Sequence, residues 1–440
     1  MHYLDLKKKI KSKKAKILVA GLGYVGFPIL FQFFRKGFNC TGFDIDKKKI
    51  KQIKNNKFNE EYFSKIILKK KKHSLKFNKL SFTSNYRAIK DADVIIVSLP
   101  TPINNLKKPD LSAIKSFLKN IKNYIKKGQL ISFESTVAPG TTEKVFGDLI
   151  KQKKFNLSKD FFLVYSPERE NPIIDNINQK LNLYNTPKVC AGSSKACTDL
   201  GCLLYSKIIK RVVRTEKIIS AEMTKMVENV YRSINIGLAN ELKIICRKMN
   251  INIFEVLRLA STKPFGFTSF SPGPGVGGHC IPIDPYYLID KAKQFNHNSK
   301  FIALSLKINE EITNYTIKEI IKLFKDKNIS KNDKILFLGA AYKANIDDIR
   351  ESPAIKIISY FKNRKYKINY CDPHVKNIEI DKKKIQSILL NYNSFKKYSV
   401  VIILTDHKKF IQKKLVTNSR LIIDTRGLLK NTKNKKIIYL

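Results

Sequence analysis

The sequence has 440 residues, of which 43% are hydrophobic, and its 85 basic and 36 acidic residues give a net charge of +49. This length predicts two or three domains, and the composition is typical of a globular protein rather than a disordered or fibrous one. No apolar run reaches the roughly 20 residues that a membrane-spanning helix requires, so we expect no membrane association.

The positive charge permits two interpretations. It suggests a polyanionic partner such as nucleic acid, but only 12 of the basic residues are Arg, and Lys is spread over the whole chain. A genome rich in A and T would produce this composition without selection for binding, and we favour that interpretation. We therefore expect no specific nucleic-acid partner, although a positive field would attract anionic ligands.

The seven cysteines are odd in number and irregularly spaced, which argues against a disulfide framework. No zinc-site spacing follows Cys197 and Cys202, so we expect no metal. A basic stretch at residues 7–16 precedes an apolar stretch at residues 17–34, as in a signal peptide, but the apolar stretch contains three glycines and Pro28, and no cleavage site follows. We therefore expect a cytoplasmic protein.

The first half of the chain alternates strand and helix patterns. Residues 16–20 predict a buried strand, a glycine loop follows, and an apolar helix continues to about Lys36, where Gly37 can end it. Further strands are predicted at 39–45, 94–100, 129–136 and 161–167. Such alternation indicates a doubly wound parallel sheet.

Residues 220–249 contain no Pro and predict one long helix, which would connect domains or form a dimer interface. Its apolar stripe comprises Met223, Met226, Val227, Val230, Ile234, Leu238, Leu242 and Ile245. Residues 264–287 are rich in Gly and Pro and predict irregular structure.

A second α/β region follows, with strands predicted within residues 334–342, 367–373, 400–406 and 421–427. The predicted fold class is thus α/β, with two Rossmann-like doubly wound domains joined by a long central helix. We expect an NAD-binding domain at residues 1–212 and a helical dimerisation region with the reactive loop at 213–318. A second Rossmann-like domain would occupy residues 319–440.

A dinucleotide-binding motif opens the first domain. Gly21, Gly23 and Gly26 fit the pattern GxGxxG between a predicted strand and a predicted helix, so a pyrophosphate would lie on the helix N-terminus beside Tyr24 and Val25. Asp44 lies 18 residues after Gly26, where a carboxylate can bind the ribose 2′-hydroxyl, which favours NAD over NADP. Lys49 either approaches the adenosine end or is solvated.

The most informative segment is GPGVGGHCIPID at residues 273–284. A thiol at the end of a glycine-rich loop is accessible to a substrate, and nearby backbone N–H groups can lower its pKa and bind an oxyanion. Asp284 lies four residues after Cys280 and can position water. The alternative is a Cys buried in a turn, which these residues alone do not exclude.

The chain resembles the UDP-glucose/GDP-mannose dehydrogenase family. It matches characteristic sequence segments of that family, in the same order, over nearly its whole length. The matching segments are GLGYVG (21–26), PTP (100–102), ESTVAPGTT (134–142), SPERENP (166–172), EMTKMVEN (222–229), GPGVGGHCIPIDPYYL (273–288) and YKANIDDIRESPA (342–354). Within the family, STKPFGF (261–267) joined to the Cys280 segment is most similar to UDP-N-acetylglucosamine 6-dehydrogenases.

The resemblance implies an NAD-dependent, four-electron oxidation of a UDP-sugar 6-hydroxyl to a carboxylate. Cys280 would attack the intermediate aldehyde to form a thiohemiacetal, a second oxidation would give a thioester, and water would release the acid. The cofactor implied is NAD, the substrate is most simply UDP-N-acetylglucosamine, and the product would serve surface-polysaccharide synthesis. A homodimer through residues 220–249 is also expected.

The resemblance also implies roles for individual residues. Lys225 and Asn229 would share one helix face, contact the substrate and stabilise oxyanion character. Glu168 would act as acid or base, next to Arg169 in the substrate site. Asp284 and Thr136 would order the hydrolytic water.

Other residues would hold the two ligands. Thr101 and Thr136 would line the nicotinamide side, Arg350 would reach the cofactor and Lys343 the UDP-sugar. A loop would wrap the uridine or sugar, formed by Ser269, Phe270, Ser271, Pro272, Gly273 and Gly277. Alternatively, these residues have no role in ligand binding: the threonines cap helices, and the charged side chains are solvated on the surface.

The chain departs from some relatives at three positions. Pro172 replaces a second Glu, Ile283 replaces a Lys, and Ser271 stands where relatives often have a larger Tyr or Arg. The last departure leaves the sugar pocket open, so UDP-glucose and UDP-N-acetylgalactosamine or -mannosamine remain alternative substrates. We interpret His279 as loop scaffold rather than as a base.

Two rival functions remain. A two-electron hydroxy-acid dehydrogenase shares the predicted layout but needs no nucleophilic Cys, so Cys280 argues against it. A polyanion-binding protein without catalysis agrees with the charge, but Lys225, Asn229 and Asp284 argue against it.

Overall fold

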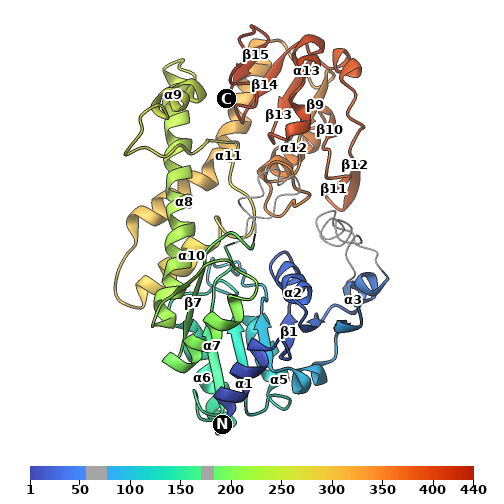
Figure 1. Ribbon diagram of the computed structural model, residues 1–440. Coiled ribbons are helices and arrows are strands. Elements are labelled where there is room, and N and C mark those ends of the chain that lie inside the picture. Colours follow the sequence, from blue (N-terminus) through green and yellow to red (C-terminus); the bar gives the residue numbers. More distant parts are fainter. Residues whose placement is uncertain (56–76, 170–182) are drawn as a thin grey trace. The chain divides into compact units, whose positions relative to one another are not determined.

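The computed structural model describes residues 1–55, 77–169 and 183–440, which form two compact units. One unit contains residues 1–228 and 286–297, and the other contains residues 229–285 and 298–440. Figure 1 labels the elements of both. Within the described ranges, no helix combines the length and the apolar character that crossing a bilayer would require.

The first unit contains a sheet of strand order β3-β2-β1-β4-β5-β6-β7-β8. β1 to β6 are parallel, β7 is antiparallel to β6, and β8 is parallel to β7. The strands are β1 (Lys16–Ala20), β2 (Asn39–Phe43), β3 (Leu80–Thr83), β4 (Val94–Val97), β5 (Gln129–Phe133), β6 (Phe161–Tyr165), β7 (Lys188–Gly192) and β8 (Val212–Arg214). The order 3-2-1-4-5-6 is that of a dinucleotide-binding fold, whose ligand lies between β1 and β4.

Helices cover both faces of this sheet, because successive residues of a strand point to opposite sides. Ile17 and Val19 join the core under α1, α2 and α7, whereas Leu18 and Ala20 join the core under α5 and α6. The helices are α1 (His2–Lys11), α2 (Gly26–Arg35), α3 (Lys47–Lys54), α5 (Ser112–Ile121), α6 (Thr141–Gln152) and α7 (Lys195–Tyr205). The predicted doubly wound sheet is confirmed, and the stretch that resembled a signal peptide is β1 and α2.

The second unit contains a parallel sheet of order β10-β9-β13-β14-β15, again doubly wound. Its two cores take alternate residues of β9, with Ile335 and Phe337 on one face and Leu336 and Leu338 on the other. The strands are β9 (Lys334–Leu338), β10 (Lys367–Cys371), β13 (Val400–Ile403), β14 (Ile422–Asp424) and β15 (Ile437–Tyr439), with a hairpin of β11 (Asn377–Ile380) and β12 (Lys383–Gln386).

The predicted long helix is α8 (Ile218–Lys248). It packs against α11 (Lys300–Asp326) where Gly237 leaves space for Ser305 and where Asn240 donates a hydrogen bond to Asn309 at 3.0 Å. The remaining helices are α9 (Ile253–Ala260), α10 (Asp284–Lys293), α12 (Pro353–Asn363) and α13 (Lys413–Asn418).

Two expectations need correction. The irregular segment ends earlier than predicted, because α10 begins at Asp284 and takes in the last four residues of the range 264–287. The apolar stripe of α8 divides between two faces: Met226 and Val230 are buried, whereas Val227, Leu238 and Ile245 are exposed. Pro172 lies outside the described residues.

Candidate functional site

The glycine loop has the close packing that its motif predicts. Gly21 has φ +92°, and a Cβ there would lie 2.3 Å from the carbonyl oxygen of Ser98. A Cβ on Gly26 would lie 2.0 Å from the carbonyl oxygen of Gly21, so the first turn of α2 can approach β1 only without a side chain. A Cβ on Gly23 would meet nothing within 4 Å, which leaves the loop open where a pyrophosphate would bind. Tyr24 and Val25 continue this loop into α2, with Val25 as its N-cap.

Asp44 follows β2 and holds the same loop. Its Oδ2 accepts a hydrogen bond from the Leu22 N–H at 3.0 Å and forms an ion pair with the Lys49 ammonium at 3.2 Å. Its Oδ1 accepts a hydrogen bond from the Asp46 N–H at 3.1 Å. Lys49 therefore lies beside Asp44 at the end of β2, where an adenosine ribose would be recognised.

Thr101 and Thr136 come after β4 and β5; β4 pairs with β1, and β5 pairs with β4. Their loops are joined, because the Ser135 hydroxyl donates to the Leu99 carbonyl at 2.7 Å. The hydroxyl of Tyr287 donates to the Pro102 carbonyl at 3.0 Å. Because the carboxyl ends of parallel strands meet at one edge of a sheet, both threonines lie on the same edge as the glycine loop.

Glu168 follows β6 and is buried in a network of charges. Its Oε1 accepts the N–H of Arg169 at 2.7 Å, and its Oε2 lies 3.6 Å from the ammonium of Lys188. The Lys225 ammonium donates to the Glu168 carbonyl at 2.6 Å, which fixes this turn against α8. Arg169 pairs with Glu228, also on α8.

A further carboxylate joins two of the family-like segments. Glu222 on α8 accepts the N–H groups of Gly140 at 2.5 Å and Thr142 at 2.8 Å, at the N-terminus of α6. An anionic side chain is favoured there because the first N–H groups of a helix have no partner within it. The start of α8 is thus tied to the segment that contains Thr136.

In the second unit, Cys280 lies four residues before Asp284, the first residue of α10. Its carbonyl accepts the N–H groups of Ile283 at 3.1 Å and Asp284 at 2.8 Å. The carboxylate of Asp284 accepts a 2.5 Å hydrogen bond from the Asn229 amide, and both side chains are buried. Asn229 lies four residues after Lys225 on α8. None of the seven cysteines, all within the described ranges, forms a disulfide.

The glycines before Cys280 pack against the segment 342–353. A Cβ on Gly277 would lie 2.6 Å from Cβ of Tyr342, and one on Gly278 would lie 2.8 Å from the ring of Tyr342. A Cβ on Gly275 would lie 2.3 Å from the Thr313 hydroxyl. The two longest family-like segments therefore form one packed structure, and the glycines permit it.

Of the remaining predicted residues, those at 269–272 directly precede this loop in the sequence, and Lys343 comes after β9 of the second sheet. Ser269 and Ser271 are exposed, Phe270 packs edge-on against Tyr231 with ring centroids 5.8 Å apart, and Pro272 is buried. Burial lowers the pKa of Lys343, as does the charge of Arg232.

The Arg350 guanidinium pairs with Asp348 of its own loop at 2.6 Å. Its predicted contact with the cofactor stays a prediction.

Sequence reasoning missed Arg426, which follows β14. A Cβ on Gly273 would lie 2.6 Å from its guanidinium, and its Nε donates to the Leu404 carbonyl at 3.0 Å. An Arg two residues after a buried strand, at the same sheet edge as Lys343, was the available signal. Lys243 on α8 was also missed; it donates to the Gly273 carbonyl at 3.2 Å.

The first unit thus brings together the glycine loop, Asp44, Lys49, Thr101, Thr136 and Glu168 at one sheet edge, with Lys225 tied to Glu168. The second unit brings together Asn229, Asp284, Cys280 and the glycines that pack on Tyr342.

Comparisons with known proteins agree along the chain. Residues 15–209, 219–311 and 336–431 match the NAD binding, central and UDP binding domains of the UDP-glucose/GDP-mannose dehydrogenase family. A UDP-N-acetyl-D-mannosamine dehydrogenase from Methanococcus vannielii is 32% identical, covering 97% of this chain and 96% of its own. A UDP-N-acetyl-D-glucosamine 6-dehydrogenase from Salmonella typhi is 33% identical, with 91% of each chain covered.

A solved structure of a UDP-D-ManNAc dehydrogenase from Pyrococcus horikoshii superimposes with a TM-score of 0.83 at 30% identity, covering 96% of this chain and 98% of the other. Matches of this extent, in domain order and over nearly the full length, show that the chain belongs to the UDP-glucose/GDP-mannose dehydrogenase family.

Proposed function

We propose that the protein oxidises the 6-hydroxyl of a UDP-N-acetylhexosamine to a carboxylate in two successive two-electron steps. The observation that carries this proposal is the buried hydrogen bond between Asn229 and Asp284, one helical turn after Cys280. A two-electron dehydrogenase needs no thiol at this place, whereas a four-electron oxidation needs a nucleophile that retains the aldehyde.

NAD, when bound, accepts a hydride from carbon 6 in each step. The open face of the glycine loop at Gly23 and the carboxylate of Asp44 fit this cofactor. Gly21 and Gly26 would allow its pyrophosphate to approach α2, with Lys49, Thr101, Thr136 and Arg350 as further contacts.

Cys280 would add its sulfur to the aldehyde carbon, and the carbonyl oxygen would take up a proton. Loss of the second hydride together with the hydroxyl proton would leave a thioester, which water cleaves to the acid and the free thiol. Asp284, oriented by Asn229, would hold that water together with Thr136. Lys225 would stabilise the developing oxyanion, and Glu168 would move the proton.

The substrate would be bound by cations and by the loop before Cys280. Lys343 suits the pyrophosphate because an ammonium pairs well with phosphate oxygens. Arg169, Gly277 and residues 269–273 would contact the sugar and uridine. The names of the two relatives support both the N-acetylglucosamine and the N-acetylmannosamine sugar, which differ only at carbon 2, so we propose the two as the candidate substrates.

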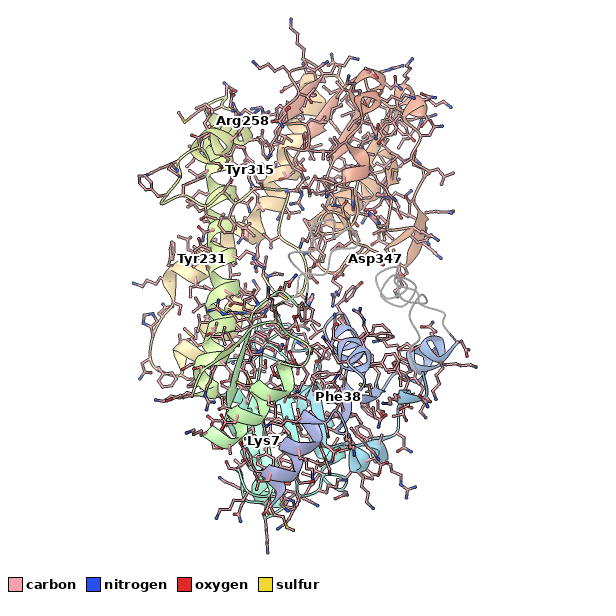
Figure 2. All side chains as sticks on the ribbon, in the orientation of Figure 1. Lys7, Phe38, Tyr231, Arg258, Tyr315 and Asp347 are labelled. Carbon is pink, nitrogen blue, oxygen red and sulfur yellow. The ribbon has the colours of Figure 1, made fainter. Side chains whose placement is uncertain are left out.

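We also propose a homodimer in which α8 of one chain meets α8 of a second. Tyr231 (Figure 2), Leu238 and Ile245 lie on one side of this helix and are 53%, 53% and 47% exposed. Contiguous exposed apolar side chains of this kind mark an interface. The domain division proposed is residues 1–212, 213–318 and 319–440.

The test is the amount of NADH formed per sugar consumed. We expect two NADH per sugar with UDP-N-acetylglucosamine or UDP-N-acetylmannosamine, and a large loss of acid product in Cys280→Ala. Cys246→Ala is the matched control, because this thiol lies on α8 and packs against α9. One NADH per sugar, unchanged by Cys280→Ala, would identify a two-electron dehydrogenase, and turnover of UDP-glucose alone would correct only the sugar.

A further inference from the structure

A buried lysine lies between two carboxylates beside the proposed catalytic site. Lys188 is the first residue of β7, and its ammonium lies 2.5 Å from Oε2 of Glu134 and 3.6 Å from Oε2 of Glu168. The side chains of Lys188 and Glu134 are 3% and 0% exposed. A lysine this deeply buried keeps its charge only where it is paired, because removing a charge from water is costly.

The Lys188 ammonium makes two hydrogen bonds and one longer ion pair. One hydrogen bond goes to Glu134, and a second goes to the carbonyl of Pro167 at 3.1 Å. The third side faces the carboxylate of Glu168. Because Pro167 directly precedes Glu168, Lys188 holds both the backbone that leads into Glu168 and the charge at the end of its side chain.

Glu134 serves as the fixed anchor of Lys188. Its other oxygen, Oε1, accepts a hydrogen bond from the Tyr205 hydroxyl at 2.5 Å, and that hydroxyl is 2.7 Å from the Ser132 hydroxyl. The ring of Tyr205 also lies 5.1 Å from the Lys188 ammonium. Both oxygens of Glu134 are therefore occupied by the protein itself.

The charges in the cluster explain why Lys188 stays protonated. Burial alone would lower the pKa of Lys188, but the charges of Glu134 and Glu168 outweigh it and raise that pKa. Burial also raises the pKa of Glu134 to about 7, against the opposing effect of Lys188. The titratable groups facing Lys188 are Glu134 after β5, Glu168 after β6, Cys190 on β7 and Tyr205 on α7.

We infer that Lys188 is a positioning residue for Glu168: its positive charge, anchored on Glu134, holds the Glu168 carboxylate and the backbone before it in place. The inference rests on the proton-transfer role proposed for Glu168. An opposite charge at this distance favours the ionised form of a carboxylate.

The test is the pH profile of kcat/KM for NADH formation from UDP-N-acetylglucosamine or UDP-N-acetylmannosamine, whichever is turned over. In Lys188→Met the acid limb of this profile should shift to higher pH by about one pH unit, with KM for NAD unchanged. Lys188→Arg, which keeps the charge, should restore the wild-type limb. Glu134→Gln should move the limb down, because Lys188 then has Glu168 as its only anionic partner.

A loss of rate by the same factor at every pH in Lys188→Met, with no rescue by Lys188→Arg, would overturn the inference. If Lys188→Met does not fold, an unmoved acid limb in Glu134→Gln, whose amide has the same shape, overturns it equally. Glu168→Gln separates the two proposals. If Glu168→Gln keeps wild-type activity, the proton-transfer role of Glu168 is wrong. If Glu168→Gln is inactive but the acid limb of the pH profile does not move in the Lys188 and Glu134 variants, only the positioning role of Lys188 is rejected.

Discussion

At the scale of single residues, each of the two sheets has an Asp at the equivalent position, but the two side chains differ in exposure. Asp44 and Asp372 each follow the second strand of their sheet and accept N–H groups from the loop after the first strand, at 3.0 Å from Leu22 and at 2.7 Å from Ala340. The side chain of Asp44 is 12% exposed, whereas that of Asp372 is 0% exposed and is closed off by His407 at 3.0 Å. Only Asp44 can meet a ribose hydroxyl, so the second sheet is not built to bind a dinucleotide in this way.

A second residue-scale feature is the charge of Lys243. Burial, together with the charge of Arg426, lowers the pKa of Lys243 to about 7, and Asp424 and Glu319 oppose this only in part. Between about pH 7 and pH 10 the unfolded chain therefore holds a proton that the folded chain lacks, and raising the pH in this window stabilises the fold.

We expect the free energy of unfolding of the wild type to rise, relative to Lys243→Met, by about 1 kcal/mol per pH unit between pH 7.5 and 9.5. Urea unfolding at several pH values measures this difference. Lys248→Met is the control, because Lys248 is exposed on the same helix and its replacement should give a difference that does not vary with pH. A flat difference for Lys243→Met would show that the residue is already charged in the folded state.

At the scale of elements, the reactive loop depends on backbone contact with its neighbours. Gly273 is held at both its backbone groups, since its N–H donates to Asn240 at 3.1 Å and its carbonyl accepts from Lys243 at 3.2 Å. Gly277 lies against Tyr342 and the Glu351 carbonyl, where an ideal Cβ would be 2.6 and 2.9 Å from their atoms. The position of Cys280 is thus set by packing of α8 and the segment 342–353, and not by the loop alone.

Gly277→Ala should therefore displace the loop and reduce kcat by about 100-fold, because small errors in the position of a reacting group are costly. Steady-state NADH formation measures the effect. Gly147→Ala in α6 is the matched control: its Cβ would meet nothing within 4 Å, so it should raise the free energy of unfolding by about 0.5–1 kcal/mol and leave kcat unchanged. A Gly277→Ala enzyme with wild-type kcat would contradict the packing argument.

At the scale of the whole molecule, local patterns were sufficient to predict the fold, and they supplied the residues that we propose for the site. β1 and β4, beside the glycine loop, were predictable because each is a run of mostly buried apolar residues with a turn signal after it. β7 was not predicted because it begins with the buried Lys188. β8 was not predicted because it has only three residues. Lys188 and Glu134 were missed for a related reason: their partners are distant in sequence, and in a chain this rich in lysine no local signal marks Lys188.

The exposed side of α8 gives the last prediction. Leu238 points away from the core of its unit, so Leu238→Glu should not disturb the fold of one chain. In a dimer through α8, the same change would bury a carboxylate without a partner, which is strongly unfavourable. We therefore expect the wild type to have the mass of two chains by light scattering and Leu238→Glu the mass of one, with a similar far-ultraviolet circular dichroism spectrum.

Leu4→Glu is the control for this experiment, because Leu4 is equally apolar and exposed but lies on α1. It should leave the mass unchanged. A wild type with the mass of one chain would reject the dimer, and a Leu238→Glu protein that keeps the mass of two chains would place the interface elsewhere. If the dimer dissociates as expected, NADH formation by the monomer then tells whether each chain is a complete enzyme, since a site that draws on a second chain would lose activity together with the mass.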